Sequence, residues 1–277
     1  MPNQKLVSDN KVIEYWKIEE DCVWHQGRKN RRADVDSFEI RDEWERRFIA
    51  RDQRAIYHGW SEVKQAERDT FEVLGDGYYR DAKTGFYEFE TSLKPLKGGA
   101  AGDFRYLGGG YARDAEFGYY SGKALKPCTS PLTLESVEAD SFYAIDESNV
   151  YFDGASLKTV DVATWQLLEE RGYSRDAKCI FFGAKKLPRA DLESWQHVKD
   201  GYSRDESRIY YWHQILKGAD LDSWKPVDVH YSIDAKHVYY FGTQVEGADP
   251  GSFDIDSESK ASDRFGAIEY GRRVKPA

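Results

Sequence analysis

Eight aspartates recur along the chain at intervals of 29 to 33 residues, and carboxylates at regular spacing are the first candidates for chemistry. They are Asp52, Asp81, Asp114, Asp146, Asp176, Asp205, Asp234 and Asp263. Regularly spaced aspartates bind Ca²⁺ in some β-solenoids, and that ion takes six to eight oxygen ligands. Because no D-x-D-x-[DN]-G run accompanies these residues, we interpret them as structural turn residues and expect no metal site.

Other residue types that carry catalysis show no reactive spacing. His25, His58 and His213 follow Val-Trp, Ile-Tyr and Tyr-Trp, so we interpret them as equivalent strand positions of a repeat rather than metal ligands. The triple glycine at 108–110 lacks the Lys and Ser/Thr of a phosphate loop, and no G-x-S-x-G occurs. The three cysteines form no C-x-x-C pair. The sequence therefore predicts no catalytic residue, no cofactor and no enzyme.

The turn aspartates belong to a longer repeated pattern, which is clearest in residues 231–255. That stretch contains a turn at Asp234, the apolar run 238–241, a second turn at Gly242, a return strand at Val245 and a helical turn that ends on Phe253. Asp accepts hydrogen bonds from amides two residues on, and Gly adopts the left-handed backbone of a hairpin. We therefore predict a β-hairpin plus one helical turn in each unit of about 30 residues.

The helical turns are marked by a capping residue four positions before an apolar anchor. The pairs are Asp34–Phe38, Glu67–Phe71, Thr133–Val137, Asp161–Trp165, Asp191–Trp195, Asp220–Trp224 and Asp249–Phe253, and one further unit has Phe104 with Ala100 at the cap. Ser or Thr precedes the anchor at Ser37, Thr70, Ser136, Thr164, Ser194, Ser223 and Ser252.

These patterns predict an all-β fold, and the 19 tyrosines and 8 tryptophans favour strands. We expect a tandem array of about eight hairpin-plus-helical-turn repeats in an elongated, curved solenoid. A closed propeller-like ring stays open as the alternative, although about 30 residues are short for a four-stranded blade. Residues 1–44 are predicted to form a divergent repeat or cap, and residues 45–277 the array, with longer loops at 76–137. The whole is expected to be one continuous structural unit.

The units resemble the DKNYY family, whose repeat runs D-K-N-x-V-Y-Y-x-G-K-x-(I/L)-x-G-A-D-P-x-S-F. Residues 234–242 with 247–253 are the closest copy, and residues 204–211 with 218–220 are similar to it. The resemblance covers about residues 45 to 275 and departs by insertions between 76 and 137. It implies a repeat fold without catalytic residues to carry over. Similar proteins are bacterial, and some look like products of toxin–immunity loci.

The net charge and the composition limit the classes of partner that this chain is expected to bind. The net charge of -9 argues against nucleic acid as the partner and would suit a basic protein, although ordinary solubility explains an acidic surface equally well. No run approaches the roughly 18 apolar residues of a membrane helix, and no charged-then-apolar leader opens the chain, so we expect a cytoplasmic protein. The expected function is a non-enzymatic protein-binding repeat protein, specifically an immunity protein that neutralises a bacterial toxin or effector. A carbohydrate or cell-surface binding module is the alternative.

Partner-binding residues are expected among aromatics that lie off the repeat consensus, because exposed Trp and Tyr are favoured as interface anchors. These candidates are Trp16, Trp44, Trp60, Phe89 and Trp212. Tyr and Phe at consensus positions are expected to pack in the core.

Overall fold

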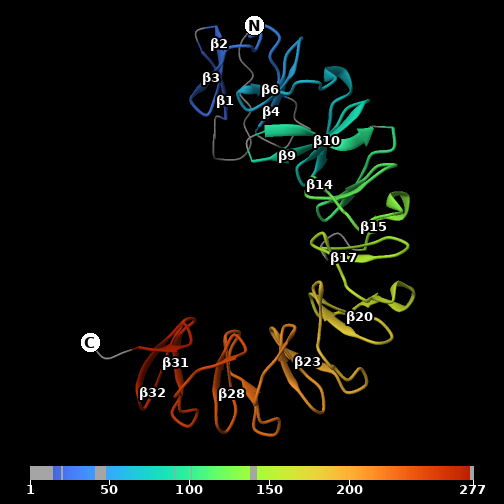
Figure 1. Cartoon of the computed structure of the whole chain (residues 1–277). Helices are drawn as coiled ribbons and strands as arrows, with labels where there is room; N and C mark the ends of the chain where they lie inside the picture. The colour runs from blue at the N-terminus through green and yellow to red at the C-terminus, as the bar shows by residue number, and fades with distance from the viewer. Residues whose placement is uncertain are drawn as a thin grey trace. The chain divides into compact units, whose positions relative to one another are not determined.

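A computed structural model describes residues 15–19, 21–40, 48–90, 92–100, 102–137 and 142–274. Over these residues the fold is all-β, with nine small antiparallel sheets of three or four strands and three short 3₁₀ helices (Figure 1). Hydrogen-bonded neighbours are consecutive in the chain in every sheet, so each sheet is a simple meander. The prediction of an all-β, solenoid-like repeat protein is confirmed.

The strands follow one another at short intervals. The first four sheets contain β1 (Trp16–Glu19), β2 (Cys22–His25) and β3 (Arg28–Asn30); β4 (Ile49–Arg51), β5 (Ile56–His58) and β6 (Ser61–Glu62); β7 (Glu72–Gly75), β8 (Tyr78–Arg80), β9 (Thr84–Phe89) and β10 (Ser92–Ala100); and β11 (Arg105–Gly108), β12 (Tyr111–Arg113), β13 (Gly118–Tyr120) and β14 (Lys123–Ala124). The fifth contains β15 (Glu135–Ser136), β16 (Tyr143–Ile145), β17 (Val150–Phe152) and β18 (Ala155–Ser156).

The last four sheets contain β19 (Gln166–Leu167), β20 (Tyr173–Arg175), β21 (Ile180–Phe182) and β22 (Lys185–Lys186); β23 (Gln196–Lys199), β24 (Tyr202–Arg204), β25 (Ile209–Tyr211) and β26 (Gln214–Ile215); β27 (Lys225–Pro226), β28 (Tyr231–Ile233), β29 (Val238–Tyr240) and β30 (Thr243–Gln244); and β31 (Asp254–Ser257), β32 (Lys260–Asp263), β33 (Gly266–Glu269) and β34 (Arg272–Arg273). The 3₁₀ helices are η1 (Arg68–Thr70), η2 (Pro131–Thr133) and η3 (Val162–Thr164). By compactness the chain divides into a first unit, Met1–Ser148, and a second unit, Asn149–Ala277.

The core of each unit lies between consecutive sheets. In the second unit one cluster joins Tyr202, Ile209 and Tyr211 with Tyr239 of the next sheet. The central strands are buried along consecutive residues rather than on one face, as in the fully buried β25. Because both faces of these strands are covered, their sequences are continuous apolar runs instead of alternating patterns.

The turn aspartate of each repeat is a buried hydrogen-bond acceptor. In Asp234, Oδ1 accepts bonds from the amides of Lys236 and His237, both at 2.7 Å. Oδ2 accepts the amide of Asp220 at 3.0 Å and the hydroxyl of Tyr239 at 2.9 Å. Burial alone raises the pKa of the Asp234 carboxyl, but these hydrogen bonds outweigh it and hold the pKa below its usual value. One carboxylate thus joins the hairpin, its strand and the preceding helical turn.

The same connection recurs along the chain. The amide of the capping residue donates to the turn aspartate in the pairs Asp34–Asp52, Glu67–Asp81, Asp161–Asp176, Asp191–Asp205 and Asp249–Asp263. The Ser or Thr hydroxyl before the anchor accepts the amide that follows the turn aspartate, for Ser37, Thr70, Thr133, Thr164, Ser194, Ser223 and Ser252. The recurring Ser/Thr therefore attaches the helical turn to the hairpin.

The predicted register of one unit is wrong. The helix η2 follows Ser130, and the residue after it, Leu134, is fully buried, whereas Val137 is only half-buried. Both Ser130–Leu134 and the predicted Thr133–Val137 satisfy the four-residue spacing. Pro131 decides between them, because proline is favoured at the first helical position. The residue before the anchor is consequently Thr133 rather than the predicted Ser136, and its hydroxyl accepts the amide of Glu147.

Side-chain capping is also only partly as predicted. The carboxylates of Asp34, Asp191 and Asp220 accept the amide three residues on, at 3.2, 2.9 and 3.0 Å. Glu67 and Asp161 make no side-chain capping hydrogen bond. In those two repeats the helical turn is attached through the backbone amide of the capping residue and through the hydroxyl of Thr70 or Thr164.

The tyrosine–aspartate bond should contribute measurably to stability. We expect Tyr210→Phe to lower the free energy of unfolding by about 2 kcal/mol, because it removes the 2.8 Å hydrogen bond to the buried Asp205 carboxylate. Tyr211→Phe is the matched control, since the Tyr211 hydroxyl makes no hydrogen bond to the described residues. Denaturant unfolding of both variants gives the comparison. Equal losses would show that the bond to Asp205 contributes nothing special.

The lowered carboxyl pKa values predict acid sensitivity. A carboxylate whose folded pKa lies below its unfolded value stabilises the fold at higher pH, and this contribution is lost as the pH falls. Asp52, Asp234 and Asp263 all have pKa values below the ordinary 3.8. We therefore expect stability to begin to decline below about pH 5 and to keep falling as the pH passes through the lowered carboxyl pKa values. Asp234→Asn should be less stable at neutral pH and lose less on acidification; an unchanged pH slope would contradict this origin of acid sensitivity.

Candidate functional site

Each four-stranded sheet has two ends of different character. In the sheet β23–β26, the turn between β24 and β25 contains Asp205. The opposite end, which we call the tip end, contains the loop between β23 and β24 and the hairpin turn between β25 and β26. Strand pairing of Tyr211 with Gln214 leaves Trp212 and His213 as that two-residue tip. The hydrogen bonds of the turn aspartate and of the recurring Ser/Thr lie at the aspartate end, so the tip end is where residue types can vary.

The first residue of each tip has a positive φ. In the described chain these residues are Gln26, Gly59, Glu90, Ser121, Asp153, Gly183, Trp212, Phe241 and Tyr270, with φ between 46° and 57°. Glycine and short polar residues tolerate this conformation, whereas it is unfavourable for bulky ones. Among the first six tips, Gly59, Ser121, Asp153 and Gly183 follow that preference, and Gln26 and Glu90 have longer polar side chains. The last three, Trp212, Phe241 and Tyr270, are aromatic, and we call them the aromatic tips.

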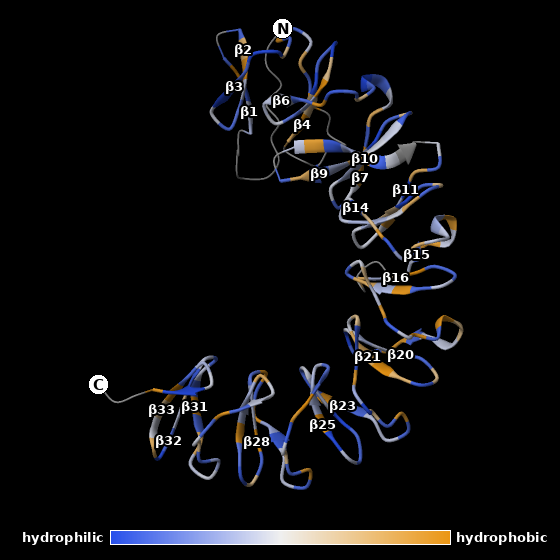
Figure 2. Cartoon of the chain, viewed as in Figure 1, coloured by the Kyte–Doolittle hydropathy of each residue, from blue (hydrophilic) through white to orange (hydrophobic). Residues whose placement is uncertain are grey.

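The aromatic tips are exposed to solvent. Their exposed fractions are 43% for Trp212, 39% for Phe241 and 67% for Tyr270. Three more exposed hydrophobic residues, Val198, Val227 and Val229, lie at the same ends of these sheets. Figure 2 shows hydrophobic segments in orange within the sheets of the second unit, among hydrophilic segments in blue. We call these six residues the apolar end of the second unit.

Two of the aromatic tips rest on other rings. Trp212 stacks on Phe182, with centroids 5.9 Å apart and planes 4° from parallel, and on Tyr211 at 4.8 Å. Phe241 contacts Tyr211 at 5.9 Å and Tyr240 at 4.6 Å. Rings held by neighbours lose little conformational freedom on binding, so this surface is preorganised.

The second residue of the tip allows consecutive repeats to pack closely when it is glycine. Gly242 lies over the ring of Tyr211 in the preceding repeat, and an added Cβ would be 2.7 Å from the Tyr211 Cβ. Gly271 lies over Tyr240 in the same way, with 2.6 Å to Cδ1. Glycine is required here by close packing as well as by its positive φ.

Carboxylates accompany the aromatic tips. The first loops of the last three sheets contain Asp200, Asp228 and Glu258. Asp228 accepts the amides of His230 and Tyr231 at 2.8 and 2.6 Å, which orders its loop. Burial and then the charge of Asp200 raise the pKa of Tyr211 to about 12. The apolar end therefore has acidic groups beside it.

The sequence candidates are dispersed in the structure. Trp212 is one of the aromatic tips. Trp16 and Trp60 are half-buried against His25, at ring-centroid distances of 4.4 and 6.2 Å. Phe89 is also half-buried, and Trp44 lies outside the described residues. Trp16, Trp60 and Phe89 belong to the first unit and Trp212 to the second.

The predicted equivalence of three histidines holds for two of them. His25 and His58 are buried and end strands β2 and β5. His213 lies in a tip, and Tyr211 occupies the equivalent strand end. The similar preceding residues had placed His213 two positions too early in the repeat.

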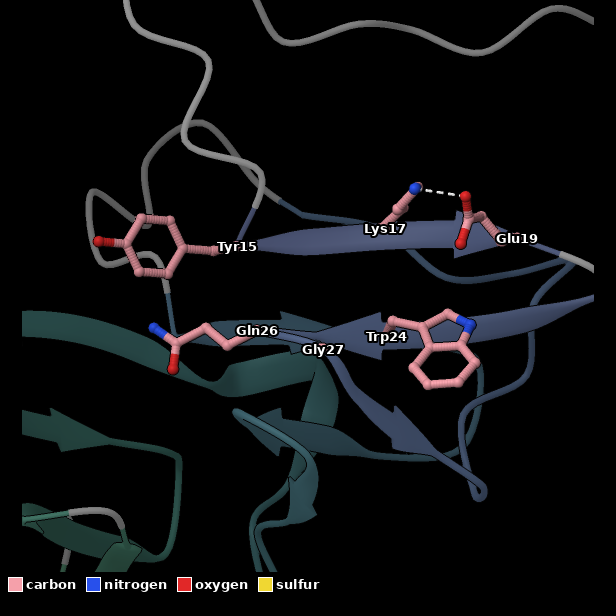
Figure 3. A pocket seen from close by; sticks show the side chains of 6 residues that line it. All are labelled: Tyr15, Lys17, Glu19, Trp24, Gln26 and Gly27. Carbon is pink, nitrogen blue, oxygen red and sulfur yellow. Dashed lines mark ion pairs between the residues drawn. The ribbon is translucent and has the colours of Figure 1, made fainter.

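A hollow on the first sheet is the other candidate (Figure 3). It has a volume of about 300 Å³ and is lined by Tyr15, Lys17, Glu19, Trp24, Gln26 and Gly27. Lys17 and Glu19 form an ion pair, so the one carboxylate is already neutralised by a cation. Among the described residues no three His, Cys, Asp or Glu side chains are grouped to hold a metal. The hollow offers aromatic and polar surface rather than a nucleophile with its base.

Sequence reasoning missed most of the apolar end. Phe241 had been assigned to the strand, and Tyr270 and the three valines were not singled out. A signal was present, because Trp212, Phe241 and Tyr270 are spaced by 29 residues and the last two directly precede Gly. Neither their exposure nor their backbone conformation is visible in that spacing.

Comparison with known proteins gives a family. The model of the DKNYY family matches residues 15–148 and 143–265. No curated protein and no solved structure matches the chain. The match begins at residue 15, ahead of the region from about 45 in which the motif is recognisable by eye. No helix in the described part of the chain is long and apolar enough to cross a membrane.

If the aromatic tips serve binding rather than folding, replacing one should not destabilise the chain. We expect Phe241→Asp, which copies the Asp153–Gly154 tip, to leave the free energy of unfolding unchanged or raise it by about 1 kcal/mol through relief of backbone strain. Tyr211→Ala, at a buried ring, should cost about 3 kcal/mol. Denaturant unfolding measures both; a comparable loss at Phe241 would place it in the core.

Proposed function

The chain belongs to the DKNYY family, and we propose that it is a non-enzymatic protein-binding repeat protein that binds its partner at the apolar end of the second unit. One observation carries this proposal: three consecutive repeats place an exposed aromatic residue where the backbone favours glycine or a short polar residue. Strained backbone conformations of this kind cluster at functional sites.

The chemistry of the apolar end supports a protein partner. Aromatic side chains are enriched in the energetically dominant positions of protein interfaces. Exposed hydrophobic residues that gather with polar neighbours mark interaction sites on soluble proteins. Val198, Val227 and Val229 add aliphatic surface to the three rings, which suits the mixed apolar face of a protein.

A carbohydrate ligand is the second candidate, because the exposed rings of the aromatic tips could stack on sugars. The neighbouring valines weigh against it. Aliphatic side chains contribute neither stacking nor hydrogen bonds to a sugar, whereas both side-chain types are buried together in protein interfaces.

The more specific form of the proposal is an immunity protein that acts in the bacterial cytoplasm and neutralises a toxin or effector by covering it. The net charge of -9 supports a basic partner through electrostatic attraction. The association of similar proteins with toxin–immunity loci supports the same form. This form requires binding but no catalysis by this chain.

Co-expression with the product of the neighbouring reading frame tests the proposal. We expect that product to arrest growth alone, and this chain to restore growth and co-purify with it. The double variant Trp212→Gly with Phe241→Asp should weaken binding by at least about 30-fold, the effect of losing one strong interface residue. These substitutions copy tips already present at Gly183 and Asp153.

The matched control is Ser121→Gly, a tip substitution in the first unit, which should leave affinity unchanged. Full affinity in the double variant would exclude the apolar end as the binding surface. A harmless neighbouring product would remove the immunity proposal, and hits on a glycan array with no protein partner would favour the carbohydrate alternative.

A further inference from the structure

We infer that the segment bound at the apolar end is an amphipathic α-helix of the partner, with basic residues beside its apolar stripe. This inference rests on the proposed function and names the kind of partner structure that fits the same surface. It follows from the spacing of the exposed side chains, from the geometry of helices and strands, and from the charges beside the apolar end.

The exposed side chains form two rows across consecutive sheets. One row contains Trp212, Phe241 and Tyr270, and the other contains Val198 and Val227; within each row the residues are 29 positions apart. The tips are structurally equivalent, because each lies between the paired ends of the third and fourth strands of its sheet. Each of these three sheets thus contributes one aromatic ring at the first position of its tip.

The packing of the sheets sets the distance between rings. One core cluster joins the sheet β23–β26 to β27–β30, and another joins β27–β30 to β31–β34. Consecutive sheets in this part of the second unit therefore pack face to face, as their order in Figure 1 shows. Packed sheets lie about 10 Å apart. Three equivalent tips consequently span about 20 Å.

A helix matches this repeat and a strand does not. Seven residues of α-helix, two turns, rise about 10.5 Å and return to the same face. A partner helix along the row would present residues i, i+7 and i+14 to the three tips. In a strand about three residues cover 10 Å, but side chains alternate between faces, so every second tip would meet the wrong face. A strand could therefore contact only alternate tips.

The second row fits the width of a helix. An amphipathic helix has apolar residues at i, i+3, i+4 and i+7, which form a stripe more than one residue wide. Residues i, i+7 and i+14 would lie over the rings, and those at i+3 or i+4 over Val198 and Val227. Val229 extends the aliphatic row within the first loop of the sheet β27–β30.

The carboxylates beside the apolar end indicate which residues should flank the apolar stripe of the partner helix. Asp200, in the first loop of the sheet β23–β26, already lies 3.9 Å from the Lys199 ammonium. Asp228 and Glu258 provide one carboxylate in the first loop of each of the next two sheets. Lysine and arginine beside the apolar stripe would meet them. Binding should accordingly weaken as the salt concentration rises, because such exposed pairs are screened.

Two synthetic peptides of about 18 residues and identical Leu, Lys and Ala composition provide a defined probe. In one, Leu recurs at three- and four-residue intervals, as in a helix; in the other, Leu alternates, as in a strand. Titration calorimetry with the full chain should show at least tenfold tighter binding of the helical pattern. The variant Trp212→Gly with Phe241→Asp should lose that preference, and Ser121→Gly should keep it. Equal binding of both peptides, or of neither, would overturn the helix inference.

The cognate complex gives an independent test. A photo-crosslinking amino acid is placed at position 212, 241 or 270 of the full chain, and at position 121 as the control. We expect the three tips to crosslink to one partner segment at intervals of about seven residues, with none from position 121. Crosslinks to separate segments, or at other intervals, would overturn the helix while protein binding stands. A complex that forms without any crosslink from the tips would overturn the binding surface itself.

Discussion

The fold depends on one interaction, the buried carboxylate of the turn aspartate with its hydrogen-bond donors. In Asp234 these are two amides of its own turn, the amide of Asp220 and the hydroxyl of Tyr239. A buried carboxylate is costly unless its oxygens are satisfied, so at Asp234 the hairpin, the helical turn and the tyrosine must all be in place together. Phe86 and Phe181 replace the tyrosine after Asp81 and Asp176, whose carboxylates each accept three backbone amides. In the last repeat the turn aspartate is still the acceptor, but an arginine side chain donates to it instead of a tyrosine hydroxyl. Both terminal nitrogens of the Arg273 guanidinium donate to Asp263, which holds the pKa of that carboxyl far below its usual range.

The turn aspartate and the recurring Ser/Thr make their hydrogen bonds at one end of each sheet, which leaves the residues at the other end free to differ between repeats. The backbone of the tips is nearly constant, with φ between 46° and 57° at the first residue, while that residue ranges from Gly183 to Trp212. A surface can therefore be changed one repeat at a time without altering the scaffold beneath it. The aromatic tips are the part of the second unit where this freedom is used for large hydrophobic side chains.

The sequence predicted the scaffold better than the surface. The spacing of the turn aspartates and the aromatic runs identified an all-β repeat, because each feature is local and recurs. The register between 130 and 137 was wrong because two overlapping cap–anchor pairs satisfy the same spacing, and only Pro131 separates them. Trp212 was selected as an off-consensus aromatic, but Phe241 was taken for the end of its strand. Which side of a strand end faces solvent depends on the neighbouring sheet, and a single unit of sequence does not contain that neighbour.

The contact of each tip glycine with the ring of the preceding repeat has a consequence for unfolding. In repeat proteins stability is approximately the sum of each repeat's own contribution and those of the nearest-neighbour interfaces, so separate stretches can unfold separately. Gly242 over Tyr211 and Gly271 over Tyr240 place part of that coupling directly beneath the aromatic tips. A ligand that touches several tips would strengthen the links between repeats as well as occupy their surface. The bound C-terminal repeats would then unfold as one cooperative block instead of fraying one by one from the end.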